Sequence, residues 1–212
     1  MTVENKNTNQ GKKLIILGFV TIVILFLMYG RYQNSELLTP SAIDTIQRIA
    51  YGFYIILVVS FGAIAFGMYR YHREKVENKG KDLSSIIALT TWNSKSRKIF
   101  VATFIGYGIF FSLVSGTLVY QPEVSFSYHY GADIPSGFIA PCCDGPGYMP
   151  KIIIYLTDHV GLQIIPINLV LQVIVSYLVG LNLAIAVNAY TISKKGRGVS
   201  TIGAATGLFI AC

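Results

Sequence analysis

Residues 121–164 contain most of the side chains in this sequence that could bind a metal or carry redox chemistry. They supply two adjacent cysteines, two histidines, several carboxylates and a methionine. Thiolate sulfur and imidazole nitrogen favour copper or zinc, so these are the metals that such a group would hold. The candidate metal or redox residues are Cys142, Cys143, His129, Asp144, Met149, Asp158 and His159, with Asp133 nearby, and no catalytic residue is assigned.

Four interpretations of the cysteine pair are open. Outside the cytoplasm a disulfide can persist, so Cys142 and Cys143 could bond to each other, between chains, or to a cysteine beyond Cys212. They could instead bind copper or zinc together with His129 or His159. Thiol-disulfide exchange is a third interpretation, although the pair lacks the two-residue spacer of a CxxC motif. The fourth is a pair of thiols with no special role.

Prolines dominate the first part of the same segment. Five of the seven prolines in the chain fall between residues 121 and 150, together with several glycines. Proline removes a backbone donor and disfavours helices and central strands, so the sequence predicts a stiffened, irregular loop. The stretch KIIIYLTDHVGLQI, residues 151–164, is expected to form a short interfacial helix or re-entrant piece that returns Asp158 and His159 towards the loop.

The elements that must position this loop are membrane spans. Hydrophobic residues make up 53% of the 212 residues and charged residues only 13%, which is outside the usual balance of a soluble domain. A helical span needs about 20 mostly apolar residues. Stretches of this kind are predicted at 14–30, 49–69, 99–120 and 165–192. The first is too long for a cleaved signal peptide and lacks a small-residue cleavage site.

The distribution of Lys and Arg predicts the orientation. Eight of them lie between Arg70 and Lys98, three precede the first span, and none lies between Ile99 and Pro150. Positively charged short loops stay in the cytoplasm, so the N-terminus is expected inside and the cysteine segment outside. The net charge of +7 then indicates contact with anionic lipid heads and not nucleic-acid binding.

Together these patterns predict an all-α integral membrane protein of the plasma membrane. Its expected parts are a cytoplasmic tail (1–13), three spans with a basic cytoplasmic loop at 70–98 (14–120), an extracytoplasmic loop (121–164) and a fourth span (165–192). Residues 193–212 are expected to form a cytoplasmic loop and a truncated fifth helix. The final apolar run of 14 residues would extend about 21 Å as a helix, which is too short to cross. We expect a fragment whose fifth helix continues, and the alternative is a half-inserted segment packed among the other helices.

Two patterns concern helix packing. Residues 83–98 have apolar side chains at helical spacing beside Trp92 and basic residues, which predicts either a short interfacial helix or a solvated loop. In the fourth span, every fourth residue is small or carries an amide, a pattern typical of close helix contacts. We call Asn168, Gln172, Ser176, Gly180, Ala184 and Asn188 the small-residue ridge. The alternative for these amides is a substrate pathway, but the span has no ionisable residue.

The segment PCCDGPGYMPKIIIYLTDHVG and the ending GAATGLFIAC resemble multi-pass membrane proteins of uncharacterised archaeal families, particularly those of ammonia oxidisers. The resemblance covers roughly the second half of the chain. It implies a membrane location and a place beside a copper-dependent membrane complex such as archaeal ammonia monooxygenase. It assigns no catalytic residue.

The leading functional hypothesis is a non-enzymatic subunit or accessory protein, whose outer loop binds a partner or a metal. Its expected partners are the bilayer and other membrane subunits or a second copy, and not nucleic acid. The alternative is a membrane thiol-redox or copper-handling protein that uses Cys142 and Cys143. A small-solute transporter is third. The sequence contains no Walker loop, dinucleotide fingerprint, HExxH or GxSxG motif.

Overall fold

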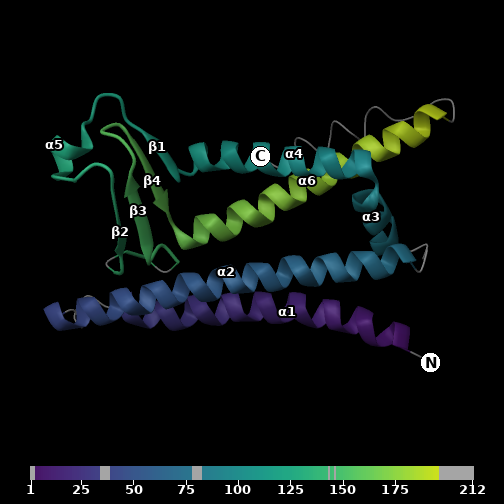
Figure 1. Ribbon diagram of the computed structural model, residues 1–212, viewed down its shortest axis with the longest axis horizontal. Coiled ribbons are helices and arrows are strands. Elements are labelled where there is room, and N and C mark those ends of the chain that lie inside the picture. Colours follow the sequence, from purple (N-terminus) through teal and green to yellow (C-terminus); the bar gives the residue numbers. More distant parts are fainter. Residues whose placement is uncertain (1–2, 34–38, 78–82, 143, 146, 196–212) are drawn as a thin grey trace. The chain divides into compact units, whose positions relative to one another are not determined.

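In the computed structural model, four long helices and one small sheet make up the chain (Figure 1). The structure describes residues 3–33, 39–77, 83–142, 144–145 and 147–195. The long helices are α1 (Val3–Tyr29), α2 (Pro40–Glu77), α4 (Ser94–Val114) and α6 (Pro166–Lys195). Short helices are η1 (Gly30–Gln33), α3 (Leu83–Trp92) and α5 (Phe126–Tyr130).

Each long helix contains a segment that is long and apolar enough to cross a membrane. These segments are Gln10–Tyr32, Ala42–Glu77, Ser94–Val114 and Pro166–Tyr190. The prediction of four long apolar helices is therefore confirmed, and these helices are compatible with a multi-pass membrane protein. Of the two alternatives for residues 83–98, a helix is present over Leu83–Trp92 as α3, while residues 94–98 begin α4. The predicted fifth helix lies outside the described residues.

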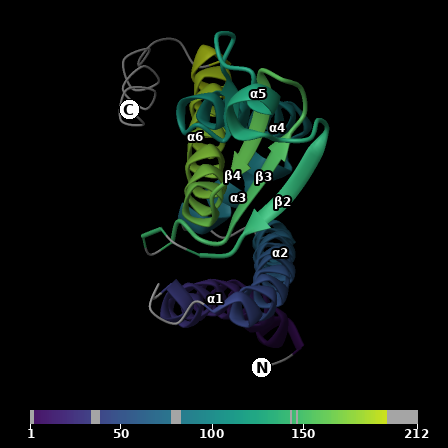
Figure 2. The same ribbon diagram turned by 90° about the vertical axis from the view of Figure 1, so that its left-hand side faces the viewer.

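The prediction of an all-α fold is wrong, because residues 118–164 form a four-stranded antiparallel sheet. Its strands are β1 (Leu118–Tyr120), β2 (Ser136–Ala140), β3 (Lys151–Tyr155) and β4 (Val160–Ile164), in the order β1-β4-β3-β2. In the register, Ile153 lies opposite Phe138 in β2 and Gln163 in β4. Figure 2 shows β2, β3 and β4 side by side, with α5 at one end of them.

The location of the prolines explains why the loop prediction failed. Pro135 precedes β2, Pro141 follows it, Pro150 precedes β3 and Pro166 begins α6. Because each proline lies at an element boundary, none removes a donor from the interior of a strand. The β-branched run at 152–154 forms part of the central strand β3, so residues 151–164 are a β-hairpin and not an interfacial helix or re-entrant piece.

Several predicted boundaries also move. The α1 helix includes most of the predicted tail, and α2 continues through the charged residues 70–77 that were expected in a loop. The third predicted span ends early, since α4 stops at Val114 and Leu118–Tyr120 pair with β4 as strand β1.

Contacts divide the chain into two compact units, and each long helix contributes to both. One comprises Met1–Ile16, Ala63–Ile109 and Val173–Cys212, and the other comprises Leu17–Gly62 and Phe110–Gln172. The first contains 14 of the 17 Lys and Arg residues and 4 of the 10 Asp and Glu residues, giving +10, and the second contains 3 and 6, giving −3. We call them the basic unit and the sheet unit.

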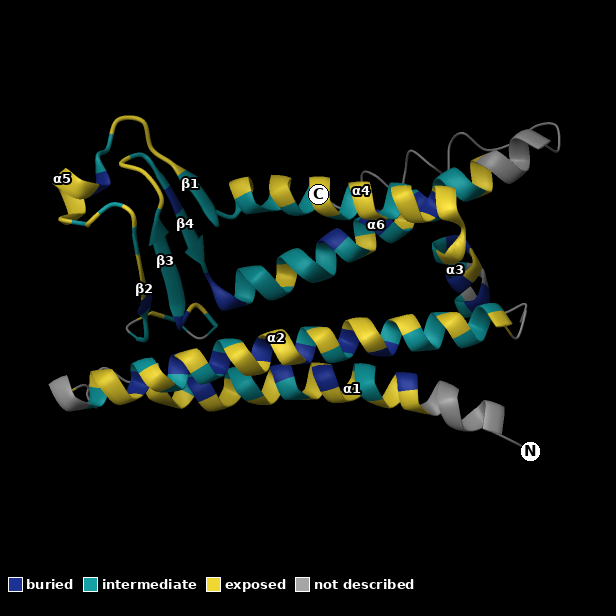
Figure 3. Cartoon of the chain, in the orientation of Figure 1, coloured by how far each residue is buried: buried dark blue, intermediate teal, exposed yellow. Residues whose placement is uncertain are grey.

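Aromatic packing forms the core of the sheet unit. Phe53 of α2 is buried, with its ring centroid 5.5 Å from that of Phe26 and 5.1 Å from that of Tyr29, both in α1. Leu57, one turn beyond Phe53, is also fully buried. Figure 3 shows the buried positions of α1 and α2 and the mostly exposed α5. These side chains pack α1 against α2 within the sheet unit.

Small residues bring helices together in the basic unit. A β-carbon added at Gly67 of α2 would lie 2.9 Å from the Gly11 oxygen of α1, so the two backbones touch. A β-carbon at Gly180 of α6 would lie 3.1 Å from the Phe100 oxygen of α4. Such close approach is the packing mode that small residues permit between membrane helices.

Candidate functional site

The cysteine loop, residues 141–150, joins β2 to β3 and is attached to the helices at both ends. At its start, the Tyr29 hydroxyl of α1 donates to the Pro141 carbonyl at 2.6 Å. At its end, the Tyr54 hydroxyl of α2 lies 2.6 Å from the Pro150 oxygen and 3.1 Å from the Ile164 oxygen of β4. Backbone carbonyls of a proline-rich loop need such donors when they are part-buried. Two tyrosines therefore fix where the loop begins and ends.

The second half of the loop is packed against α1 and the start of α6. Gly147 has φ +84°, and a β-carbon there would lie 3.4 Å from Ile167 and 3.6 Å from Phe26. The Ile167 amide donates to the Gly147 carbonyl at 3.1 Å. Met149 is buried and Pro150 is fully buried. Met149 therefore packs as a core side chain of the sheet unit.

The first half of the loop carries the cysteines. Cys142 is half-buried and lies within electrostatic reach of the Tyr29 hydroxyl, whereas Cys143 and Pro146 lie outside the described residues. Next to them, the Asp144 carboxylate accepts from the Lys151 ammonium at 2.5 Å and from the Gly145 amide at 2.7 Å. The Lys151 hydrogen bond is the main reason why the pKa of Asp144 is lowered, so this carboxylate is ionised at neutral pH.

Asp158 and His159 lie in the turn between β3 and β4, where their hydrogen bonds attach the segment that includes α5. The Asp158 carboxylate accepts from the hydroxyl of Ser127 and, at 3.0 Å, from that of Ser125, the N-cap of α5. These hydrogen bonds lower the pKa of Asp158, and the one from Ser127 has the largest effect. The Phe126 amide also donates to the Asp158 carbonyl at 2.8 Å. Asp158 is therefore an anchor for α5.

His159 also forms hydrogen bonds to the segment before α5. Its Nδ1 lies 3.1 Å from the Gln121 oxygen and 3.0 Å from the Val124 oxygen. Carbonyl oxygens only accept, so Nδ1 must carry the proton in these contacts. The Gln121 amide donates in return to the His159 carbonyl at 2.9 Å. His159 thus ties the β1–α5 connection to the hairpin.

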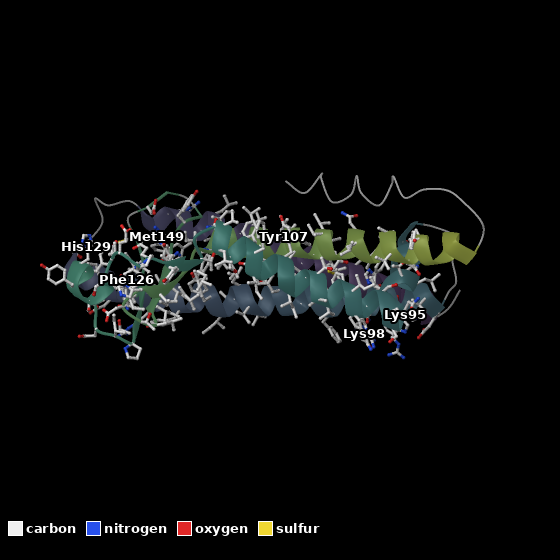
Figure 4. The ribbon with its side chains drawn as sticks, turned by 90° about the horizontal axis from the view of Figure 1, so that it is seen from above. Lys95, Lys98, Tyr107, Phe126, His129 and Met149 are labelled. Atoms are coloured by element: carbon white, nitrogen blue, oxygen red, sulfur yellow. The ribbon has the colours of Figure 1, made fainter. Side chains whose placement is uncertain are left out.

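The predicted metal or redox residues therefore form two separate groups. Cys142, Asp144 and Met149 lie before β3, whereas Asp158 and His159 lie after it, and five strand residues extend about 16 Å. His129 lies exposed on α5, with its ring centroid 4.8 Å from that of Tyr130, at the sheet end of Figure 4. No three metal-ligating side chains are grouped, and no disulfide occurs, within the described part of the chain. The structure does not bring the histidines to Cys142.

An aromatic cluster is the feature of this region that the sequence analysis missed. The Tyr155 ring of β3 lies 5.2 Å from the Phe126 ring, 6.5 Å from that of Tyr130 and 6.3 Å from that of Phe138. Gly161 makes room for it, since a β-carbon there would lie 3.3 Å from Phe126. The available signal was the frequency of aromatic residues between 120 and 155, which exceeds what a solvated loop needs.

Several aromatic side chains at or beside this cluster are exposed. Tyr128 is 93% exposed, Tyr130 57% and Phe138 46%. We call these three side chains the aromatic surface. They lie on α5 and β2, and the α5 segment is fixed by Asp158 and His159. Tyr120 is also exposed, but the register places it on the opposite face of the sheet from Phe138. The aromatic surface is therefore presented by a preorganised scaffold.

The small-residue ridge of α6 contacts neighbouring helices in each unit. In the sheet unit, Gln172 Nε2 lies 2.7 Å from the Ser112 hydroxyl and Asn168 Nδ2 lies 3.4 Å from the Ser115 oxygen, just beyond the end of α4. In the basic unit, Asn188 Nδ2 lies 3.2 Å from the Thr90 hydroxyl of α3. Ser176 and Ala184 are buried. The amides of the ridge thus take part in interhelical hydrogen bonds.

Comparison with known proteins adds no assignment to this geometry. No family model matches the chain, and neither the curated proteins nor the solved structures include a match.

Proposed function

We propose that this chain is a non-enzymatic subunit or accessory protein of a membrane complex, and that its sheet domain docks a partner protein outside the membrane. The observation that carries the proposal is the aromatic surface. Tyrosine and phenylalanine are enriched in protein interfaces because they bury a large area with few rotatable bonds. Three such side chains, exposed on α5 and β2 of one anchored sheet domain, form a binding surface.

The state of the reactive groups supports binding over catalysis. His159, Asp158 and Asp144 each already make hydrogen bonds that hold loops together, and Met149 is buried. A metal or a substrate would have to displace these contacts. The interhelical bonds of Gln172 and Asn188 likewise favour helix packing over a solute pathway along α6.

The charge difference between the two units supports the proposed orientation. The basic unit has a net charge of +10 and the sheet unit −3. Since Lys and Arg are retained on the cytoplasmic side, the basic residues at 70–98 lie inside in this proposal and the sheet lies outside.

Purification of tagged full-length chain from its native membrane in mild detergent tests the docking proposal. The wild type should elute with a partner in fixed stoichiometry, measured by native mass spectrometry. A variant with Tyr128→Ala and Phe138→Ala should lose that partner. Tyr51→Ala is the matched control, since Tyr51 is also about half exposed but lies on α2.

Two results would contradict docking by the sheet domain. One is a wild-type chain that leaves the native membrane without any stoichiometric partner. The other is a complex that survives the Tyr128 and Phe138 substitutions as well as it survives Tyr51→Ala.

A thiol-redox or copper-handling role for the cysteine loop is the second candidate. It is favoured by the half-buried Cys142 in a loop whose two ends are fixed by Tyr29 and Tyr54. Thiol labelling of intact cells with and without reductant should then give rapidly reversible modification at the pair. If Cys142→Ser and Cys143→Ser leave growth, complex assembly and bound copper unchanged, this second role is excluded.

A further inference from the structure

A cluster of three basic side chains, here called the cationic cluster, lies at the start of α4. Lys95, Arg97 and Lys98 lie in the first turns of this helix, and all three are exposed. None of their side chains forms an ion pair with any residue that the structure describes, and the first turn of α4 has no acidic residue. Lys95 and Lys98 project from the same end of α4 in Figure 4.

A second cationic cluster in the same unit is bonded differently. On α2, the Arg70 guanidinium lies 5.7 Å from the Phe66 ring centroid, and the Arg73 guanidinium lies 3.2 Å from the Glu77 carboxylate. Lys75 also has an interaction partner. The α2 cations are thus neutralised or stacked within the protein, whereas the α4 cations are not.

Because of its position, the α4 cluster would be stabilised by an anion from outside the chain. Three positive charges within four residues repel one another, and they lie at the end of the helix where the backbone dipole is itself positive. No described side chain offsets this charge. An anionic group from outside the chain would relieve both effects.

The residues that follow the cluster indicate where that anion comes from. Val101, Ile105 and Ile109 continue from Arg97 at four-residue spacing, and each is 45–57% exposed. From Arg97 to Ile109 the helix rises about 18 Å, close to the ~15 Å half-thickness of the hydrocarbon region. An apolar stripe of one leaflet's depth therefore begins at the cationic cluster.

We propose that Lys95, Arg97 and Lys98 bind the phosphate headgroup of an anionic phospholipid, whose acyl chain lies along Val101, Ile105 and Ile109. Trp92 marks the headgroup end of this lipid site. It is 40% exposed, lies three residues before Lys95, and its ring centroid is 5.7 Å from that of Tyr69. Tryptophan at such a level is typical of the membrane interface.

Trp92 is the only tryptophan in the chain, so its fluorescence reports on this site alone. Full-length protein would be reconstituted into phosphatidylcholine vesicles that contain a minor fraction of phosphatidylglycerol. Bromine atoms near the headgroup end of the acyl chains would be placed either on the anionic lipid or on an equal mole fraction of the neutral lipid. We expect stronger quenching of Trp92 by the brominated anionic lipid.

Two triple variants with equal loss of charge separate a specific site from general attraction. Lys95→Gln, Arg97→Gln and Lys98→Gln together should lower the preference for the anionic lipid by at least about fivefold, the effect of one charge near a membrane surface. Arg70→Gln, Arg73→Gln and Lys75→Gln together should leave it near the wild-type value. Arg97→Lys, which keeps the charge, should also retain the preference.

Three results would overturn the lipid site. Equal quenching of the wild type by both brominated lipids would show no preference at Trp92. Equal loss in the two triple variants, with helix content unchanged by circular dichroism, would show general attraction only. Recovery of fluorescence on addition of inorganic phosphate would show a site for free anions and not for a lipid.

Discussion

Different interactions stabilise the interior of the basic unit and the interior of the sheet unit. In the basic unit, glycines allow backbones to touch, as between Gly67 and Gly11 and between Gly180 and Phe100. In the sheet unit, the buried Tyr29 and the half-buried Tyr54 donate hydrogen bonds across the fold, to Pro141 and to Pro150 respectively. The first mode joins regular helices, whereas the second fixes irregular backbone.

This difference follows from what each unit contains. Helices satisfy their own backbone groups, so their association depends on close packing. The cysteine loop leaves carbonyls without backbone partners, so side-chain donors must supply them. Substitutions should therefore affect the two units by different mechanisms.

Gly67→Leu should have the largest effect, because its side chain would collide with the α1 backbone at Gly11. We expect a loss of about 3 kcal/mol in the free energy of unfolding, typical of overpacking at a rigid contact. Thermal unfolding in detergent, followed by size-exclusion chromatography, measures it. Gly62→Leu is the control on the same helix, because a β-carbon at Gly62 meets nothing within 4 Å. Equal destabilisation by both would contradict the packing account.

Tyr54→Phe should loosen the sheet unit. It removes the donor shared by the Pro150 and Ile164 carbonyls, and we expect a loss of about 1–3 kcal/mol for buried acceptors left without a partner. Hydrogen exchange should rise in residues 141–164 and stay unchanged at 94–109. Tyr51→Phe, at an exposed position of α2, should change neither segment. Uniform exchange throughout the chain would argue against a local anchor.

Gln172→Leu should have a smaller effect. It removes the hydrogen bond to the Ser112 hydroxyl, and such bonds between membrane helices contribute about 0.6 kcal/mol on average. A double-mutant cycle with Ser112→Ala isolates the coupling free energy between the two side chains. A coupling free energy of zero would mean that α6 and α4 associate near Gln172 through side-chain packing alone, without a contribution from this hydrogen bond.

Asp158 should give a small pH effect confined to the α5 anchor. Hydrogen bonds from Ser127 and Ser125 lower its folded pKa, so their stabilisation is present above the unfolded pKa of about 3.9 and is lost as pH falls through the folded pKa. The Ser127 amide signal in NMR should titrate with a midpoint below about 3.9, and Asp158→Asn should abolish that titration. A midpoint above about 3.9 would reverse the sign of the proposed linkage.

The long helices could be predicted because hydropathy alone defines a span. The apolar stretch at 49–69 has no alternative to a helix in a bilayer, and the ridge from Asn168 to Asn188 is visible at every fourth position. These signals are local, and they need no knowledge of which helix lies beside which.

The sheet could not be predicted from the same kind of signal. Its strands have three to five residues, and the run at 152–154 is too short to distinguish a strand from part of a helix. The roles of individual site residues depend on tertiary contacts. His159 has the side chain of a metal ligand, yet its Nδ1 meets the carbonyls of Gln121 and Val124, 38 and 35 residues away in sequence. Tyr29 and Tyr54 were counted only as span residues.

The proposed topology has the sheet, residues 118–164, outside the membrane and the start of α4 on its cytoplasmic side. Single cysteines at Tyr128, on the aromatic surface, and at Lys95, in the cationic cluster, test it in a chain whose three native cysteines are replaced by serine. In intact cells, a membrane-impermeant maleimide should label Tyr128→Cys at once and Lys95→Cys only after the membrane is permeabilised. Labelling of Lys95→Cys in intact cells, with Tyr128→Cys protected, would contradict the account.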